Sequence, residues 1–325
     1  MTEHTTSYYA ASANKYEPFP TLEGSINCDV CVVGGGYTGL SSALHLAEMG
    51  YDVVVLEGAR IGFGASGRNG GQLVNSYSRD IDVIEKNYGP DAAKMLGSMM
   101  FEGGDIIRER IQRYQIQCDY RPGGLFVAMN HKQLETLEEQ KANWERYGNT
   151  QLELLDREAI RREVDSDRYV GALLDHSGGH IHPLNLAIGE ADAIRLNGGG
   201  VVYGARDPND VERLIMPKLL KTFPQLQGVK IDYRWTGNFL LTLSRMPQFG
   251  RLDNNIYYMQ GYSGHGVTCT HLAGRLISEL LRGDAERFDA FAKLPHYPFP
   301  GGRSLRIPFT AMGAAYYSLR DRLGV

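Results

Sequence analysis

A short apolar strand, a glycine cluster and an amphipathic helix follow one another near the start of this chain and constrain its fold most. An apolar run over residues 29–33 leads directly into Gly34-Gly35-Gly36-Tyr37-Thr38-Gly39. Apolar side chains then recur at the spacing of one helical face, at Leu40, Ala43, Leu44 and Ala47. Gly50 ends the helical pattern, and a second apolar run covers residues 53–56. Strands apolar on both faces predict a parallel sheet covered by helices on both sides.

The six residues 34–39 match G-x-G-x-x-G, and each glycine has a separate physical role. Gly34 permits a tight turn, Gly36 lets the backbone approach a diphosphate, and Gly39 allows close packing of helix against strand. The helix start offers free N–H groups and partial positive charge to phosphates. Glu57, after the second strand, is placed to accept hydrogen bonds from an adenosine ribose. The unit predicts a dinucleotide site, and a glycine-rich turn without a ligand is the alternative.

A second glycine-rich segment, residues 60–72, follows Glu57 and reads Arg-Ile-Gly-Phe-Gly-Ala-Ser-Gly-Arg-Asn-Gly-Gly-Gln. So many small side chains let the main chain lie flat against a large planar ligand. FAD and NAD share the fingerprint of residues 34–39, so composition alone leaves both cofactors open, and a surface loop is the alternative without a ligand.

The order of these motifs resembles that of the D-amino-acid-oxidase-like, or glycine/sarcosine oxidase, family of FAD-dependent oxidoreductases. The first part of the likeness is residues 34–57 followed by Gly64-Ala65-Ser66-Gly67-Arg68-Asn69-Gly70-Gly71. The second is the closing segments 235–237, 247–250 and 261–266, the last of which meets the flavin ring in the family. The resemblance implies an α/β fold with an FAD-binding Rossmann-like parallel sheet and an interleaved mixed-sheet substrate domain, and it favours FAD over NAD.

The fingerprint and the resemblance together predict the residues that bind FAD. They are Gly34, Gly36, Tyr37, Thr38, Gly39, Glu57, Gly58, Arg60, Ala65, Ser66, Asn69, Gly70, Gly71, Gly264, Gly266 and Val267. A helix beginning near Val267 would direct free N–H groups toward charge that develops on the reduced flavin. His265 is the candidate catalytic residue, adding to that field if cationic, and an ordinary loop histidine is the alternative.

The resemblance also implies the reaction, which is oxidation of a C–N bond in a small-molecule amine. Molecular oxygen is the implied electron acceptor and hydrogen peroxide the implied product, while FAD carries the redox chemistry. Arg245 is a candidate for binding a substrate carboxylate, with a surface ion pair as the alternative. Tyr262 is a candidate for lining the substrate pocket. N-methyl or D-amino acids are alternative substrates.

Composition and charge argue against several other functions. The net charge of −4 is spread along the chain, without a basic run and interleaved aromatics, so no nucleic-acid partner is expected. The chain has no secretory start and no apolar window of about 18 residues, so we expect a cytoplasmic protein without a membrane partner.

Cysteine and histidine spacing predict no metal site. Cys28 and Cys31, three apart on a strand, point to opposite faces, so buried structural thiols are expected. The spacing of His176, His180 and His182 fits no zinc pattern, and a structural turn over 175–182 is expected instead.

The rest of the chain predicts helices and strands without a clean linear boundary. Strands are expected at 124–129, 170–174, 229–235, 239–243 and 256–259, and helices at 90–115 with a weak point at Gly103-Gly104, then at 133–147, 183–196, 211–222 and 267–282. The predicted domains are an N-terminal arm over 1–25, a discontinuous FAD-binding domain over 26–120, 175–200 and 250–325, and a partial substrate domain over 121–174 and 201–249.

The chain departs from the family pattern after Gly199. The likeness stops there and resumes at Gly200 at a point much further along the family pattern. An internal segment of roughly 100 residues of that pattern is therefore missing, although the chain is still long enough to fold as a domain. The missing part includes a strand of the cofactor sheet and about half of the substrate sheet. Stripping strands from a sheet exposes unpaired backbone. A catalytically inactive remnant therefore competes with the FAD amine oxidase, and an NAD-dependent dehydrogenase is a third hypothesis.

Overall fold

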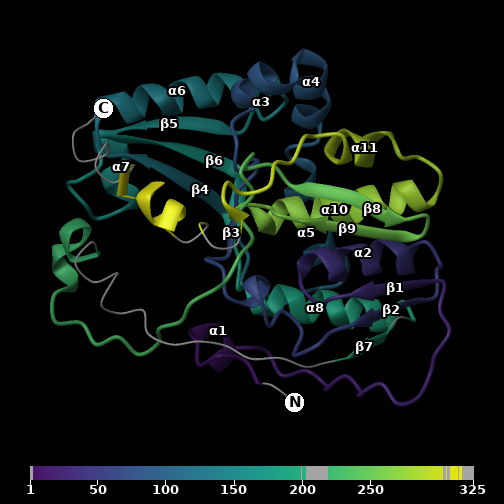
Figure 1. Ribbon diagram of the computed structural model, residues 1–325. Helices are drawn as coiled ribbons and strands as arrows, with labels where there is room; N and C mark the ends of the chain where they lie inside the picture. Colours follow the sequence, from purple (N-terminus) through teal and green to yellow (C-terminus); the bar gives the residue numbers. More distant parts are fainter. Residues whose placement is uncertain are drawn as a thin grey trace.

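The computed structural model describes residues 3–198, 200–202, 219–302, 305, 308–313 and 315–316. In Figure 1 a small parallel sheet with its helices lies beside a larger antiparallel sheet. The short helix α1 (Tyr8–Ala11) belongs to an N-terminal arm that lies along α8 (Pro183–Leu196). Ser12 Oγ of the arm is 3.1 Å from His182 Nε2, and Asn14 N donates to Asn185 Oδ1 at 2.8 Å. The described part of the arm therefore contacts the body at α8, and the predicted bounds of the arm stay a prediction.

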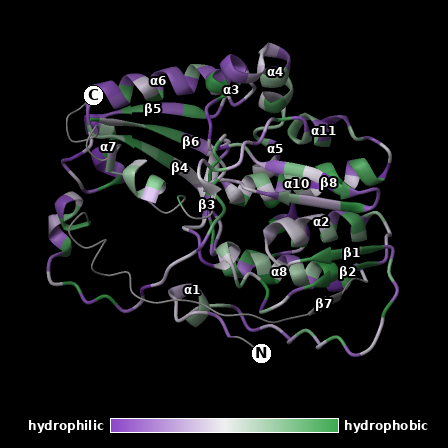
Figure 2. Cartoon of the chain, in the orientation of Figure 1, coloured by the Kyte–Doolittle hydropathy of each residue, from purple (hydrophilic) through white to green (hydrophobic). Residues whose placement is uncertain are grey.

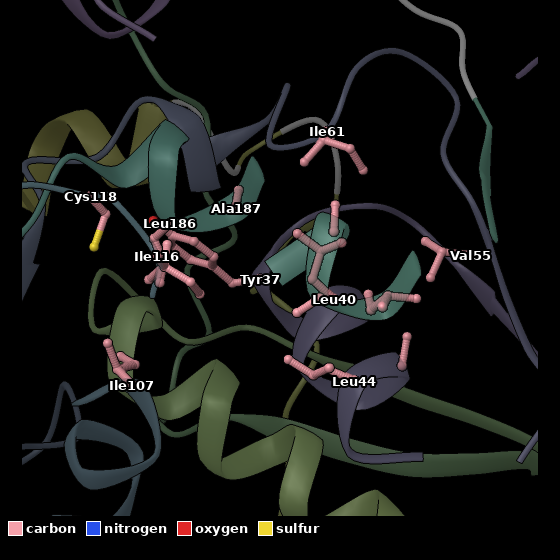
Figure 3. Close-up of a cluster of buried hydrophobic side chains, with 14 of the residues drawn as sticks. Tyr37, Leu40, Leu44, Val55, Ile61, Ile107, Ile116, Cys118, Leu186 and Ala187 are labelled. Carbon is pink, nitrogen blue, oxygen red and sulfur yellow. The ribbon is translucent and has the colours of Figure 1, made fainter. Parts of the chain in front are cut away.

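The parallel sheet contains the predicted strand–helix–strand unit. Strand β1 (Val30–Val33) pairs with β2 (Val53–Leu56), and β2 pairs with β7 (Gly200–Val202), all in parallel. Helix α2 (Tyr37–Glu48) joins β1 to β2, and α8 leads into β7. Leu40 and Leu44 of α2 belong to one buried cluster with Val55 of β2, shown in Figure 3. The N-terminal motif therefore folds as its spacing predicts.

The second face of this sheet differs from the prediction. Cys31 pairs with Val54, and Val33 with Leu56, on the face opposite α2. Val33 is 84% exposed and Cys31 is exposed too, although both strands are hydrophobic throughout in Figure 2. Within the described residues no helix covers this face, and β1 has no second neighbour. The expectations of helices on both faces and of a buried Cys31 are not met in the part of the chain that the structure describes, where no helix covers these side chains.

The antiparallel sheet is built around β6 (Gly171–His180). Strand β4 (Arg121–Ala128) pairs along one side of β6, while β5 (Leu152–Asp156) and the short β3 (Gln72–Leu73) pair along the other. Helices α6 (His131–Arg146) and α7 (Arg157–Glu163) pack on it. Leu173 joins the cluster of Leu137 from α6, and its neighbour Ala172 joins that of Ile160 from α7, so the two helices cover opposite faces.

Strand β6 runs through the segment in which a turn was expected. Residues 175–180 continue the strand because Gln72 pairs with His180 and Leu73 with Gly179. The predicted strands at 124–129 and 170–174 and the helix at 133–147 are confirmed within a few residues at most ends. The turn predicted over residues 175–182 is therefore wrong, since its partner strand β3 is remote in sequence.

Five further α-helices and a hairpin pack around the site and against the sheets. They are α3 (Ile81–Tyr88), α4 (Pro90–Ser98), α5 (Glu102–Arg113), α10 (Gly266–Leu281) and α11 (Glu286–Ala292), with the hairpin β8 (Gln248–Asp253) and β9 (Ile256–Gln260). The helix expected over 90–115 is divided before Glu102, and Gly103-Gly104 lies inside α5. A Cβ at Gly103 would overlap Thr268 O, so this glycine permits close packing against α10.

The strands expected at 229–235 and 239–243 are not formed. Residues 227–243 have no strand partner in the described chain, and Phe239 is 62% exposed. Alternating side chains favour a strand only where a neighbour supplies the backbone hydrogen bonds. Of the helix predicted over 211–222, residues 211–218 lie outside the described residues and 219–222 are helical. Among the helices described, none has the length and apolar character that crossing a bilayer requires.

The uncovered sheet face predicts a contrast between two valines on neighbouring strands. Val55→Thr places a hydroxyl in a fully buried site and should cost about 1–3 kcal/mol of unfolding free energy. Val33→Thr, on the exposed face, should change it by less than about 0.5 kcal/mol. Urea unfolding followed by circular dichroism measures both. An equal loss in the two variants would mean that the second face is covered in solution.

Candidate functional site

Three segments far apart in the sequence line one cavity of about 510 Å³. Tyr37 and Thr38 come from the start of α2, and Ala65, Ser66, Arg68 and Asn69 from the second glycine-rich segment. The third segment supplies residues 261–264 and 266–267, followed by Thr270 of α10. The remaining wall is Gly237, Asn238, Phe239, Leu240, Met259 and Gln260. The fold thus brings together the three motifs on which the sequence prediction rests.

The glycines at the start of α2 have the conformations that their roles require. Gly34 has φ +111°, a turn conformation that side chains rarely adopt, and Gly36 precedes the first turn of α2. A Cβ at Gly39 would overlap Gly34 O and lie 3.2 Å from Val32 Cγ1, so only glycine allows this close approach of helix to strand. The backbone N–H of Tyr37 donates to Ser66 Oγ at 2.9 Å, which joins the first two segments.

Glu57 lies at the end of β2 against the glycine turn. Its Oε2 accepts from Gly35 N at 2.5 Å, and its Oε1 accepts from Ala59 N at 2.6 Å. Each carboxylate oxygen has a further lone pair and can accept from a hydroxyl as well. The placement is compatible with the predicted ribose contact.

The second glycine-rich segment is ordered by its own hydrogen bonds. Asn69 Nδ2 donates to Ser66 O at 2.8 Å, and its Oδ1 accepts from Gly71 N at 2.8 Å. Trp235 Nε1 donates to Arg68 O at 3.0 Å. These contacts disfavour the mobile surface loop. All the predicted contacts with FAD stay predictions. The predicted residues that do not line the cavity are Gly34, Gly36, Gly39, Glu57, Gly58, Arg60, Gly70 and Gly71. Arg60 forms an ion pair with Glu3 of the arm.

The third segment turns sharply and opens α10. Gly261, Ser263 and Gly264 all have positive φ, and α10 begins at Gly266, as predicted. Gly266, Val267 and Thr270 put the first turn of α10 into the cavity wall. The N–H groups of this helix start and of that of α2, where Tyr37 N–H already donates to Ser66 Oγ, therefore border the same space.

His265 precedes α10 but does not line the cavity. Burial lowers the pKa of His265, although the Asp80 carboxylate partly opposes the shift. A lowered pKa keeps the imidazole neutral at neutral pH, so the geometry favours the ordinary loop histidine over a cationic catalytic group.

Tyr262 joins the third segment to α2. Thr38 Oγ1 donates to the Tyr262 hydroxyl at 3.0 Å, and the Tyr262 ring packs against Phe249. Burial raises the pKa of Tyr262, so its hydroxyl stays protonated. Tyr262 lines the cavity, whereas Arg245, in a tight turn with φ +61°, does not. Their predicted contacts with substrate stay predictions.

The histidines that were considered as metal ligands have separate partners. His176 is 3.2 Å from Glu153 at the surface, while His182 accepts from Asn185 N and caps α8. In the part of the chain that the structure describes, no group of three or more His, Cys, Asp or Glu is placed to hold a metal ion. Burial raises the pKa of Cys269 to about 12, so its thiol is a weak nucleophile.

Fold and site together define a flavin-dependent oxidoreductase. The sequence profile of the FAD dependent oxidoreductase family (DAO) matches residues 29–206 and 203–280, and the chain belongs to this family. Its cofactor is FAD, and the NAD hypothesis is set aside.

Individual relatives are more specific. The chain is 68% identical to gamma-glutamylputrescine oxidoreductase of Escherichia coli (strain K12), with 100% of each chain covered. It is 34% identical to the probable oxidoreductase OrdL of Haemophilus influenzae, with 98% of each covered. Within the family, the Ser7-Tyr8-Tyr9 arm and residues 295–306 resemble gamma-glutamylputrescine oxidase. The 68% identity to the E. coli enzyme agrees with that resemblance.

Two solved structures share the fold. L-proline dehydrogenase from P. horikoshii has a TM-score of 0.66 at 15% identity, covering 79% of this chain and 94% of its own. Glycine oxidase from Bacillus cereus ATCC 14579 has a TM-score of 0.64 at 15% identity, covering 80% of this chain and 98% of its own. The predicted fold class is confirmed, while the predicted domain bounds stay a prediction.

The comparisons also bear on the missing segment. The alignment with the E. coli relative spans 426 positions, whereas this chain has 325 residues. The two stretches that match the family profile meet at residues 203–206. Both findings agree with an internal gap soon after Gly199.

The site predicts that FAD binding depends on the Glu57 carboxylate. Glu57→Gln replaces one accepting oxygen by an amide and should raise the dissociation constant for FAD about tenfold, because hydrogen bonds to a charged group are lost. Quenching of flavin fluorescence on binding measures this constant. Glu153→Gln, at an exposed carboxylate on β5, is the control and should have no effect. Equal affinity in parent and Glu57→Gln would exclude the ribose contact.

Proposed function

We propose that this chain oxidises the primary amine of γ-glutamylputrescine with FAD, as a step in putrescine breakdown. The amine, molecular oxygen and water give the γ-glutamylated aminoaldehyde, ammonia and hydrogen peroxide. The observation that carries the proposal is the convergence of three glycine-rich segments on one cavity, in a chain 68% identical to a gamma-glutamylputrescine oxidoreductase. The cytoplasm is the proposed location.

Bound FAD supplies the two-electron redox chemistry. The C–H bond next to nitrogen breaks and its hydrogen leaves with two electrons, while the nitrogen lone pair forms a C=N bond. Water adds to the resulting imine and ammonia leaves. Oxygen takes up the two electrons with two protons, which balances the reaction.

The chain's own residues would bind and orient the cofactor and the amine. The cavity of about 510 Å³ falls in the range of small-molecule sites. The first turns of α2 and α10 present N–H groups that favour negative charge. Phe239, Leu240 and Met259 give the cavity an apolar side suited to the methylene chain of the amine.

The proposed substrate can be tested because only the true substrate should reduce the bound flavin. Anaerobic addition of γ-glutamylputrescine should bleach the flavin absorbance, whereas sarcosine and D-alanine should not. Stopped-flow absorbance under nitrogen measures the rates. Bleaching by sarcosine or D-alanine alone would transfer the assignment to an oxidase of N-methyl or D-amino acids. Readmission of oxygen should restore the absorbance and form hydrogen peroxide.

A catalytically inactive remnant is the second candidate, favoured by the exposed face at Val33 and by residues 227–243, which form no strand in the described chain. Losing strands removes burial from a fold whose net stability is only about 5–15 kcal/mol. The absorption spectrum of the purified chain separates the two: we expect a folded yellow protein with a flavin spectrum. A colourless protein that takes up no added FAD would establish the remnant.

A further inference from the structure

Three ionisable side chains are buried where helices meet beside the cavity, and none of them lines it. Arg110 of α5 is 3% exposed, and Glu190 of α8 and His271 of α10 are 0% exposed. Glu190 Oε1 lies 2.6 Å from Arg110 Nη1 and 3.0 Å from His271 Nε2. One carboxylate oxygen therefore joins three helices that are remote in sequence.

Arg110 extends this group to a fourth helix, α2. Its Nη1 donates to Ser41 Oγ at 2.9 Å, and its Nη2 donates to Ser41 O at 3.1 Å. Ser41 Oγ in turn donates to His271 O at 3.2 Å. The charged group thus holds α2 and α10 by both side-chain and main-chain atoms.

His271 links the group to the cavity wall. Its ring centroid lies 5.4 Å from that of Tyr37, and its Nδ1 is 2.6 Å from Val267 O and 3.3 Å from Thr270 Oγ1. All three of these partners line the cavity, at the first turns of α2 and α10. A shift of His271 would therefore move both helix starts.

A gain in the free energy of unfolding does not explain why these side chains are buried. Burial alone raises the pKa of Glu190, but the charges of His271 and Arg110 outweigh it and hold the pKa below its usual value. Replacing a buried ion group by apolar residues of similar volume often leaves stability unchanged or raises it. Such a group then contributes to specificity, because its geometry permits only one arrangement of the helices that carry it.

We propose that Glu190 is a positioning residue, which through Arg110 and His271 sets the spacing between the first turns of α2 and α10 and so the shape of the cavity for FAD. The inference rests on the proposed placement of FAD in this cavity. Glu190 does not line the cavity, so its effect on the cavity passes through Arg110 and His271.

Two variants separate positioning from stability. Glu190→Gln leaves Arg110 buried without an ionised partner, so both the melting temperature and FAD affinity should fall. Glu190→Gln/Arg110→Met removes both charges at similar volume and should regain the melting temperature. Its dissociation constant for FAD should nevertheless stay about tenfold above that of the parent, because the helix spacing is no longer fixed. Recovery of both quantities in the double variant would overturn the proposal.

The control is a matched pair of substitutions at another ion pair between helices, one member of which lies on α10. Arg287 Nη1 of α11 is 2.7 Å from Glu279 Oε1 of α10, and neither residue lines the cavity. Glu279→Gln/Arg287→Met should leave the FAD dissociation constant unchanged. An equal loss of affinity there would show that any broken ion pair on α10 has the effect, and would also overturn the proposal.

A measurement without FAD distinguishes failure of the cofactor placement from failure of this inference. Hydrogen exchange of the apo protein reports on peptides 34–41 and 262–271, which should exchange faster in the double variant than in the parent. A parent that binds no FAD refutes the cofactor placement alone, and unchanged exchange refutes the positioning role. Should neither Gln variant fold, Glu190→Asp keeps the charge but moves it. Faster exchange in that variant supports the role, and parental exchange overturns it.

Discussion

The close crossing of α2 and α10 is the contact on which the rest of the site depends. A Cβ at Gly274 of α10 would lie 2.6 Å from Ser41 C, so the two backbones meet where glycine faces serine. The helices lie side by side in Figure 1, and their first turns border one cavity. Two helix starts at one space concentrate N–H groups and partial positive charge, which suits a cofactor with a diphosphate and a flavin that becomes negative on reduction.

Apolar and charged groups contribute differently to the packing around this crossing. Leu40 and Leu44 bury one side of α2 against β2, and Leu272 and Leu276 bury α10 in a second cluster. Apolar contacts of this kind tolerate small slips along the helix axes. The ion group at Glu190 does not, because its distances to Arg110 and His271 depend on the register of three helices. Burial supplies stability and the charges supply a unique arrangement.

The gap after Gly199 explains where the fold is less complete than its sequence patterns. β1 and β2 keep the composition of strands buried on two faces, yet only the face toward α2 is covered in the described chain. Residues 229–235 keep the alternation of a strand, yet no described strand pairs with them. In both places the local pattern is intact and the partner is missing. The residues that line the cavity all come from outside the gap.

The sequence by itself determined the strand–helix–strand unit, the glycine turn and the position of Glu57, because those features depend on neighbours within about 30 residues. It also indicated the start of α10, from the glycines at 261–266. Only the tertiary structure decided that residues 175–180 extend β6, that Gly103 serves helix packing, and that His265 does not line the cavity. It alone brought Arg110, Glu190 and His271 together, since 161 positions separate the first from the last and no local periodicity encodes such a contact. Short-range patterns fix the elements, and long-range packing fixes which of their side chains meet.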